Sequence, residues 1–593
     1  MSHSPSASRA ILLLLFPLLA ILAVFCRCVY LQHVRHDAFV EQAARQQLKL
    51  IPLQGRRGLI VDRKGMILAQ SVKRKSLAVD PARVRDVQAT AEALAGILSD
   101  SDKPVAAGDL QARIAARRNK RFLWVKRFLS DEQAARIQAL SLPGIILQTE
   151  YHREYPLGEL AAHVVGFTDI DGQGLEGIEK QYDEDLRGQD SLWRMSSDVG
   201  RRAVFAREPL GDARDGHTIV TTLDCTIQDY LQEQLSQTVD KFQAEGACGI
   251  VVDPRSSEIL ALALTPTYNA QQARQVPAEL RRNRALTDPV EPGSIFKPFT
   301  IASALQGGFC RMDEVIDCEE GPYRAKGLGV IREYKYYHGM QPVSGILVHS
   351  SNIGSAKIAQ RMGKDYFYPM IERFGYGSPT GIDLPGEGGG ILVPLQEWRW
   401  GDYALTRASF GQGPVAATPI QVMQAFCVLA NGGRFQRPRV VRAILSSDAQ
   451  QVVQRYHTET EPARQVIAPE IARQVVTIGL RGVVQRRGGS ANKAEVDGYE
   501  VFGKSGTAQV PRKDGRGYED RQYISSFIAG APASDPRLCC LIMVYRPDRS
   551  LGLGYTGGAV AASAVGRILE YSLAYLGVPP QQADADTAMA WQQ

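Results

Sequence analysis

The stretch GACGIVVDPRSSEILALALTP, from Gly246 to Pro266, decides the fold of the larger part of this chain. Its two apolar runs flank an Asp-Pro-Arg-Ser-Ser turn, a pattern that predicts a β-hairpin. Near the other end of the chain, three more runs are typical of strands: YEVFGKSGTAQV (499–510), YISSFIAGAP (523–532) and LCCLIMVYRP (538–547). The residues between these two groups are mainly helical in pattern. We therefore expect an α+β domain whose two ends pair in one sheet.

The chain before this domain also combines strands and helices. RRGLIVDRKGMILAQSVKRKSLAVDP (56–81) alternates strand-like segments around a Lys64–Gly65 turn, and residues 82–142 are mostly helical and charged. GHTIVTTLDCTIQDYLQEQLSQTV (216–239) predicts a strand and then a capped helix. One face of that helix is apolar: Ile227, Tyr230, Leu231, Leu235, Val239 and Phe242. A boundary near Ala244 separates this region, which carries no evident chemistry, from the hairpin.

Length and composition describe a folded, multidomain protein. The 593 residues are enough for about two to four domains, and 44% hydrophobic with 22% charged residues excludes a disordered chain. The formal net charge of +6 is mildly basic and is spread over many acidic residues. The concentrated Lys/Arg stripe of a nucleic-acid-binding protein is missing, so we expect no nucleic-acid partner.

The N-terminal region predicts a membrane anchor. AILLLLFPLLAILAVFC, from Ala10 to Cys26, has no charged residue, and CVYLQ after Arg27 extends it toward the roughly 20 residues that span a bilayer. A cleaved signal peptide is the alternative, but no good small-x-small cleavage site follows, and Phe25 does not fit a lipoprotein site. The basic residues on the two sides do not decide the orientation. EQAARQQLKLIPLQG (41–55) predicts a helix leading away from the membrane.

The nine cysteines fit no disulfide framework. Cys539 and Cys540 are adjacent in a strand-like run, so their side chains should point to opposite faces of a sheet. Cys310 and Cys318 could form a bridge in an oxidising compartment, a point that the sequence leaves open. The chain contains neither a C-x-x-C pair nor a His-Glu-x-x-His run, so metal or redox chemistry has no support.

A candidate nucleophile lies in EPGSIFKPFTIASALQGG, Glu291 to Gly308, where Ser294 precedes Lys297 by three residues. Pro298 is tolerable only within the first turn of a helix, which places Ser294 at the helix N-terminus. There, free backbone N–H groups and the helix dipole favour developing negative charge. A serine hydroxyl is a weak nucleophile until a base takes its proton, and a partly desolvated lysine can be that base.

The Ser-x-x-Lys pattern is weak by itself, because a solvated helix start produces it too. A second copy, Ser490 and Lys493 in GGSANK, even contains Ser-x-Asn. Glycines precede that copy and no apolar helical face follows it, so we interpret it as a polar loop.

Two further motifs accompany Ser294 and Lys297. HSSNIGSAKIAQ supplies Ser350, whose hydroxyl could relay a proton, and Asn352, whose amide could hold a substrate carbonyl or orient the lysine. On a predicted strand, FGKSGTAQV supplies a glycine that lets a substrate backbone lie close, and an ammonium and hydroxyls that can receive a carboxylate. These residues are Lys504, Ser505, Gly506 and Thr507. The three motifs have the order and separation required to meet in one cleft.

With these motifs, the chain resembles a class B penicillin-binding protein, most closely the division-specific FtsI type. The resemblance extends over nearly the whole chain and includes RGLIVDRKGMILA (57–69), REYPLGELAAHVVGFTDIDGQGLEGIEKQYD (153–183), VEPGSIFKP (290–298) and SFGQGPVAATPIQ (409–421). SVKRKSLAVDP (71–81) favours the division type over the elongation type. Ser505 stands where threonine is common in the family, a change that keeps the hydroxyl.

The resemblance implies an enzyme that crosslinks peptidoglycan in the septal cell wall. Ser294 would attack the carbonyl between two terminal D-alanines of a stem peptide, and an amine of a neighbouring stem peptide would resolve the acyl-enzyme. Lys297 is implied as general base. Ser350 and Asn352 would assist proton transfer and orientation, and Lys504, Ser505 and Thr507 would hold the terminal carboxylate. The backbone N–H groups of Ser294 and Thr507 would form the oxyanion hole.

The resemblance also implies an architecture and partners. We expect a cytoplasmic tail (1–9), a transmembrane anchor (10–31), an elongated pedestal or dimerisation-like domain (32–243), a transpeptidase domain with a β-lactamase-like antiparallel sheet flanked by helices (244–576) and a mobile C-terminal tail (577–593). The catalytic domain would lie in the periplasm on the bacterial inner membrane. Partners would include an FtsW-type glycan polymerase and other division proteins, with β-lactams as covalent inhibitors. Neither a metal nor an organic cofactor is required.

Rival functions differ in what resolves the acyl-enzyme, or in whether one forms. A serine β-lactamase or a D,D-carboxypeptidase would use water, although the long first region and the anchor argue against the former. A β-lactam-sensing receptor would need further transmembrane helices or a signalling domain. A non-catalytic division scaffold remains an alternative, because about 200 residues precede the catalytic part without evident chemistry.

Overall fold

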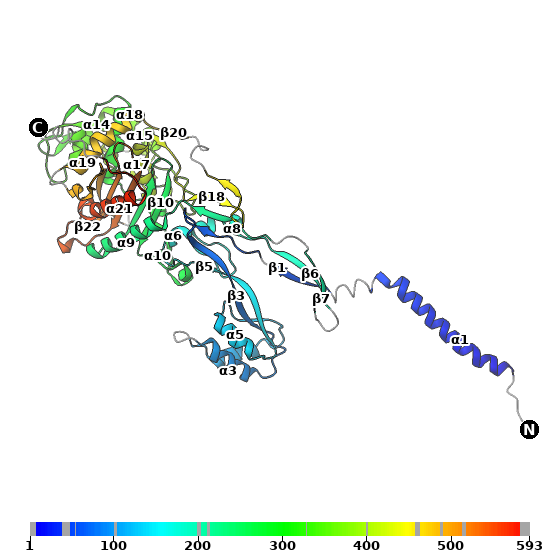
Figure 1. The fold of residues 1–593 in the computed structure, drawn as a ribbon. Coiled ribbons are helices and arrows are strands. Elements are labelled where there is room, and N and C mark those ends of the chain that lie inside the picture. Colours follow the sequence, from blue (N-terminus) through cyan, green and yellow to red (C-terminus); the bar gives the residue numbers. More distant parts are fainter. Residues whose placement is uncertain are drawn as a thin grey trace, which may run out of the picture. The chain divides into compact units, whose positions relative to one another are not determined.

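The computed structural model describes residues 7–37, 39, 48–53, 55–99, 104–197, 203–209, 214–325, 327, 329–398, 401–456, 463–486, 490–512 and 517–581 (Figure 1). The predicted cytoplasmic tail lies outside the described residues up to residue 6, and the predicted mobile tail lies outside them from residue 582 onward. The chain forms two compact units. The first comprises Met1–Arg56 and Gly188–Asp215, and the second comprises Arg57–Arg187 and Gly216–Gln593.

The first unit contains the predicted apolar helix. α1 (Ala7–Val29) continues into a π-helical turn, η1 (Tyr30–Val34). Leu15–Val34 has a mean hydropathy of 2.0, is long enough to cross a membrane and is exposed along its length. Because soluble proteins rarely expose so large an apolar surface, this helix is consistent with a single-pass membrane anchor.

A three-stranded antiparallel sheet completes the first unit, in the order β1-β6-β7. Its strands are β1 (Leu48–Leu53), β6 (Ser191–Ser197) and β7 (Ala203–Pro209). The prediction of a helix over 41–55 is wrong for the residues of β1, and residues 41–47 lie outside the described part. Leu48–Leu53 pairs with Ser191–Ser196 from a distant part of the sequence, and this long-range pairing overrides the local helical pattern.

In the second unit, the region before the catalytic part is built on a seven-stranded sheet, to which the catalytic part contributes β18 and β19. Six strands have the order β19-β18-β8-β2-β3-β4, and the seventh, β5, pairs with β3. The predicted Lys64–Gly65 turn joins β2 and β3, and Gly65 has the positive φ (+90°) that such a turn requires. The strands are β2 (Ile60–Val61), β3 (Ile67–Val79), β4 (Leu123–Lys126), β5 (Ile145–Glu154), β8 (Thr218–Thr221), β18 (Val441–Leu445) and β19 (Val452–Arg455).

Three helices pack against one end of this sheet, which confirms the helical pattern of residues 82–142. They are α3 (Val87–Leu98), α4 (Ala107–Ala115) and α5 (Asp131–Ala139). The side chain of Asp86 caps α3, and Ser130 with Gln133 forms a capping box at the start of α5. Their apolar faces meet Leu77 and Val79 of β3 in a small separate core.

A buried ion cluster joins two distant segments that are part of the family resemblance. Glu179, on the short helix α7 (Gly177–Gln181), is fully buried. Its carboxylate accepts from Arg57 Nε at 2.6 Å and from Arg153 Nε at 2.7 Å. Burial alone would raise the pKa of Glu179, but the two guanidinium groups hold it below that of a free carboxyl. The paired charges therefore fix the start of this region against its end.

The catalytic part is built on a five-stranded antiparallel sheet with the order β10-β9-β23-β22-β21. The hairpin β9–β10 matches the quoted stretch, and its strand β9 pairs with β23 from the far end of the domain. The predicted closure of one sheet by both ends of the region is therefore confirmed; the green hairpin and the orange-red strands lie together in Figure 1. The strands are β9 (Gly246–Asp253), β10 (Glu258–Thr265), β21 (Phe502–Pro511), β22 (Tyr518–Ala531) and β23 (Leu538–Tyr545).

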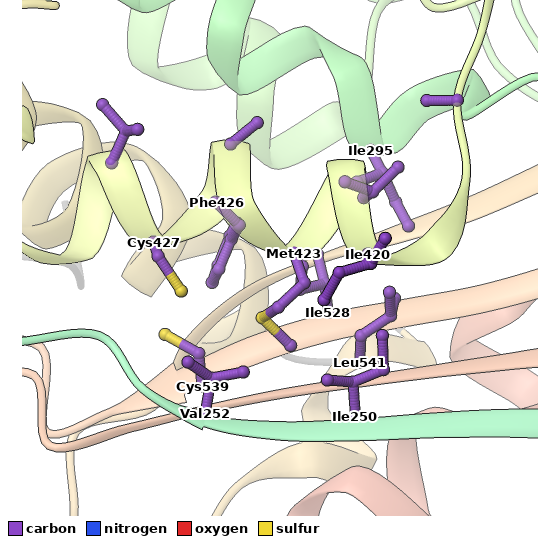
Figure 2. Close-up of a cluster of buried hydrophobic side chains, with 14 of the residues drawn as sticks. Ile250, Val252, Ile295, Ile420, Met423, Phe426, Cys427, Ile528, Cys539 and Leu541 are labelled. Atoms are coloured by element: carbon purple, nitrogen blue, oxygen red, sulfur yellow. The ribbon is translucent and has the colours of Figure 1, made fainter. Parts of the chain in front are cut away.

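Both faces of this sheet are buried. α9 (Cys225–Phe242) and α21 (Ala562–Tyr575) cover one face, and the predicted apolar face of α9 packs into that core. α12 (Lys297–Gln306) and the fully buried α17 (Pro419–Ala430) lie on the other face. Figure 2 shows α17 above the strands, with Cys427 near Cys539. Cys539 and Cys540 belong to the cores on opposite faces, as predicted.

Helices around α12 complete the catalytic part: α13 (Val343–His349), α14 (Asn352–Met362), α15 (Lys364–Arg373), α16 (Gly401–Ala408) and α18 (Pro469–Gln474). α20 (Gly557–Val560) packs against α21, and α19 (Arg481–Gln485) contributes Val483 and Val484 to the same core. The α+β fold class with an antiparallel sheet flanked by helices is thus confirmed. All nine cysteines are free thiols, and Cys310 and Cys318 are both buried.

Candidate active site

Ser294 lies in a short 3₁₀ turn, η3 (Gly293–Phe296), that leads directly into α12. The predicted helix start is therefore present, but its first turn is 3₁₀ and the α-helix itself begins at Lys297. Pro298 occupies the first turn of α12, as its geometry requires. Ser294 is half-buried, whereas the neighbouring Ile295 is fully buried in the core beside α17 (Figure 2). The buried neighbour anchors the turn while the serine stays accessible.

The segment SFGQG (409–413) forms a hydrogen bond with this turn. Gly293 N–H donates to the carbonyl of Gly411 at 2.9 Å. A Cβ atom on Gly411 would lie 2.5 Å from the carbonyl oxygen of Gly293, closer than real Cβ atoms approach, and Gly411 has a φ of +70°. Only glycine combines the positive φ with this close approach of two backbones. Gly411 therefore fixes the turn that carries Ser294.

Two lysines from different motifs converge on the hydroxyl of Ser350. Lys297 Nζ donates to Ser350 Oγ at 3.1 Å and also to the Ser350 carbonyl. Lys504 Nζ, on β21, donates to the same Oγ at 2.9 Å. Both lysines are almost completely buried. The structure therefore brings members of all three predicted motifs into one cluster.

Ser350 occupies a sharp junction between α13 and α14. It caps the C-terminus of α13 with a left-handed backbone, φ +59°. Ser351 then caps α14, because its hydroxyl accepts from Gly354 N–H at 2.9 Å. Asn352 begins α14, and its amide donates to the Arg332 carbonyl at 2.9 Å. Among the described residues, Asn352 makes this bond rather than one to either lysine.

β21 forms the edge of the sheet beside η3. A Cβ atom on Gly506 would lie 2.6 Å from Ser526 Oγ and 2.9 Å from Ile295 Cγ1, so no side chain fits there. Thr507 Oγ1 accepts from Gly557 N–H at 3.2 Å, which leaves its own hydroxyl proton available as a donor. Ser505 and Thr507 are half-buried and alternate along the strand with buried Lys504 and Gly506.

Burial changes the protonation of the lysine pair. It lowers the pKa of Lys297 to about 7, and the Glu333 carboxylate opposes that shift. Burial and the nearby Lys297 charge also hold the pKa of Lys504 well below that of a free lysine. Two ammonium groups around one hydroxyl repel each other in a poorly solvated site. Burial and mutual repulsion thus favour loss of a proton from the pair, and the neutral amine that results can accept a proton.

Sequence reasoning missed two residues of this site. Glu333 accepts hydrogen bonds from the turn before α14, and Gly557 donates to Thr507. Neither belongs to a short motif, and the bonded pairs are far apart in sequence. A carboxylate before a predicted helix start is the only signal that would have drawn attention to Glu333.

The second Ser-x-x-Lys copy lies elsewhere. Ser490–Ala494 forms a 3₁₀ helix, η6, in place of the polar loop that the sequence predicted. Within this helix, Ala491 and Ala494 belong to the core that contains α21, on the face of the sheet opposite α12. Lys493 is exposed. Within the described part of the chain, no three His, Cys, Asp or Glu side chains are placed to hold a metal ion.

An antiparallel sheet flanked by helices, beside which Lys297, Ser350 and Lys504 of the Ser-x-x-Lys, Ser-x-Asn and Lys-Ser-Gly-Thr motifs meet, is typical of the transpeptidase class of penicillin-interacting proteins. The chain belongs to the class B penicillin-binding proteins. The family model "Penicillin binding protein transpeptidase domain" matches residues 247–570, and "Penicillin-binding Protein dimerisation domain" matches residues 52–221.

Full-length relatives and solved structures agree with this assignment. The chain is 34% identical to the probable peptidoglycan D,D-transpeptidase PbpC of Pseudomonas aeruginosa over 100% of this chain and 99% of that protein. It is 32% identical to the peptidoglycan D,D-transpeptidase FtsI of Escherichia coli over 95% and 91%. Penicillin-binding protein 3 of Mycobacterium tuberculosis, in complex with aztreonam, matches with a TM-score of 0.68 and 27% identity, covering 90% of this chain and 98% of that one.

Proposed function

We propose that this chain is a membrane-anchored peptidoglycan D,D-transpeptidase that crosslinks stem peptides through an acyl-enzyme on Ser294. The observation that carries the proposal is the convergence of Lys297 and Lys504 on Ser350, beside the turn that holds Ser294. Relatives named peptidoglycan D,D-transpeptidases support the substrate class. Similar structures in complex with aztreonam and with ampicillin support β-lactams as inhibitors that acylate the same serine.

In the acylation step, Ser294 Oγ attacks the carbonyl carbon between the two terminal D-alanines. Its hydroxyl proton passes to Lys297, which is able to accept it because burial keeps its pKa near 7. The backbone N–H groups of Ser294 and Thr507 stabilise the oxyanion of the tetrahedral intermediate. The C–N bond then breaks, and the last D-alanine leaves as an amine.

Ser350 is suited to deliver the proton that the leaving amine needs. Its oxygen accepts hydrogen bonds from both lysines, so its own O–H proton is free to be donated. Lys297, protonated in the first step, replaces that proton through the same hydrogen bond. No proton has to come from bulk water in this step.

The edge of β21 receives the substrate backbone and its carboxylate. Because β21 is the last strand of the sheet, an extended peptide can lie alongside it. Lys504 and the hydroxyls of Ser505 and Thr507 hold the terminal carboxylate, whose negative charge favours the ammonium form of Lys504. Substrate binding thereby leaves Lys297 as the neutral member of the pair. Asn352 orients the stem peptide on the side of Ser294 away from β21.

The second half of the reaction distinguishes a transpeptidase from its rivals. An amine from a neighbouring stem peptide attacks the ester carbonyl, loses a proton to Lys297 and forms a new amide, and Ser294 recovers its hydroxyl proton. A division role is supported by the FtsI relative. Such a role implies a nascent-glycan supplier, and we propose an FtsW-type polymerase as that partner.

We expect the purified protein, supplied with nascent glycan and its polymerase, to form mainly crosslinked stem-peptide dimers. The physical reason is that a long-lived ester beside a positioned amine reacts faster with that amine than with water. Chromatography and mass spectrometry of the digested glycan would give the ratio of dimers to trimmed monomers. Trimmed monomers without dimers, in the presence of acceptor, would favour a D,D-carboxypeptidase instead.

We also propose that α1 is retained and that the rest of the chain lies on the periplasmic side, where peptidoglycan is accessible. Protease added to intact spheroplasts should then digest the chain beyond α1, while a control cytoplasmic protein survives. Mass spectrometry of the membrane-bound protein should find peptides from the segment before Cys26. A mature N-terminus after Cys26 would contradict the retained anchor.

A further inference from the structure

Glu333 follows the short strand β13 (Gly329–Ile331) by two residues, and it is half-buried. Its carboxylate accepts three hydrogen bonds from the start of α14: from Ser351 Oγ at 2.6 Å, from Asn352 N–H at 2.8 Å and from Ile353 N–H at 3.1 Å. Free N–H groups at a helix start favour a negative charge. Glu333 therefore determines where α14 begins.

The segment held by Glu333 follows directly after Ser350. Ser350 has the left-handed backbone that few residues other than glycine adopt easily, and Ser351 next to it is bonded to Glu333. Removing the carboxylate would leave two backbone donors and one hydroxyl without their acceptor at this junction. The position of Ser350 Oγ between the two lysines thus depends on a residue that touches neither lysine by hydrogen bond or ion pair, within the described residues.

Glu333 is also the negative charge that acts on Lys297. Among the described residues, no carboxylate forms an ion pair with Lys297 or Lys504, and Glu333 is the carboxylate that raises the pKa of Lys297 against its burial. Other ionisable groups near this junction are Lys504 on β21, Cys318 after β11 (Val315–Asp317) and His338, which packs against His349 at the end of α13. Burial and the charge of Arg486 lower the pKa of His349, and burial lowers that of His338. The charges of Lys357 and Asp317 act on Cys318.

We propose that Glu333 is a positioning residue for acyl transfer: it holds Ser350 and Asn352 through its hydrogen bonds to the start of α14 and supplies a compensating negative charge beside the lysine pair. The inference rests on the proposed function, because its readout is acylation of Ser294. Glu333 makes no contact with substrate in this scheme; it acts through Ser350, Asn352 and Lys297.

The test compares Glu333→Gln with Glu333→Asp in the full-length protein, using the acylation rate by a fluorescent penicillin as a function of pH. Glu333→Gln should slow acylation by roughly 10-fold to 100-fold, because small displacements of reacting groups cost that much. It should also move the pH at which the rate rises to a lower value, since loss of the negative charge favours neutral Lys297. Glu333→Asp keeps the charge and should keep the wild-type pH midpoint with a smaller loss of rate.

Glu319→Gln is the matched control, because Glu319 pairs with Lys357 on α14 at 2.5 Å but does not touch the turn. It should acylate like the wild type. An unshifted pH midpoint in Glu333→Gln, or a wild-type rate, would overturn the inference. If Glu333→Gln does not fold, Glu333→Asp decides: a wild-type rate in that variant contradicts positioning. Failure of the wild type itself to acylate at Ser294 would instead contradict the proposed function.

Discussion

Replacing Ser294 by alanine is expected to abolish covalent labelling by penicillin. The hydroxyl supplies the only bond that the ring-opened antibiotic forms with the protein in the proposed mechanism, so no slow residual reaction should remain. The variant should stay folded, because Ser294 is half-buried and the turn is anchored by Ile295 and Gly411. Intact-protein mass spectrometry should show the adduct in the wild type and none in Ser294→Ala.

The sequence offers its own control for this experiment. Ser490 also precedes a lysine by three residues, but its short helix packs on the opposite face of the sheet. Ser490→Ala should therefore be labelled as fast as the wild type, with thermal unfolding of both variants recorded in parallel. Peptide mapping that placed the adduct on any residue other than Ser294 would contradict the assignment of the nucleophile.

Replacing Lys297 by methionine is expected to slow acylation by roughly 10²-fold to 10⁴-fold, the usual cost of removing a positioned general base. Methionine keeps the length and the burial of the side chain but cannot accept the proton of Ser294. Stopped-flow or gel-based labelling at several penicillin concentrations would give the rate constant. Lys493→Met, which removes the exposed lysine of the second copy, is the control and should be unaffected.

The pH dependence provides a second readout for Lys297. Burial lowers its pKa to about 7, so the protonated form, which cannot act as a base, dominates below that pH. The wild-type rate should fall by roughly tenfold per unit as the pH drops below about 7, and should level off above it. This increase of the acylation rate with pH should be absent in Lys297→Met. An unchanged profile in that variant would assign the base to another group, with Lys504 the nearest alternative.

Much of the fold was predictable because its signals are local. The hairpin of β9 and β10 combines apolar runs with a turn, and α9 shows a helical repeat, so each could be recognised without its partners. β1 could not, because Leu48–Leu53 becomes a strand only through pairing with residues 191–196. The helical pattern before it gave a stronger local signal than the strand itself.

The residues of the site also divide into those with a local sequence signal and those without one. Ser294, Lys297, Ser350 and Lys504 stand in short motifs, because each role requires a particular side chain at a fixed spacing. Glu333 acts through hydrogen bonds to a segment about 20 residues later, and any carboxylate brought there by the loop could serve. The depressed pKa of Lys504 also has no local signal, since it arises from burial and from a second lysine far away in sequence.

The strand order of the catalytic sheet determines when the enzyme becomes competent during folding. β23, the last strand in sequence, occupies the centre of the sheet and joins β9 to β22. Until it arrives, the chain holds two separate strand pairs, and two-stranded ribbons are only marginally stable. The turn that carries Ser294 packs against β21, a strand of the second pair, where Lys504 also lies. Pairing of β9 with β23 closes a loop from residue 254 to residue 537. Closing so long a loop is slow and must precede assembly of the complete catalytic sheet. A partly folded chain therefore carries no complete catalytic cluster, and reactivity toward substrate or antibiotic begins only when synthesis and folding of the domain are essentially finished.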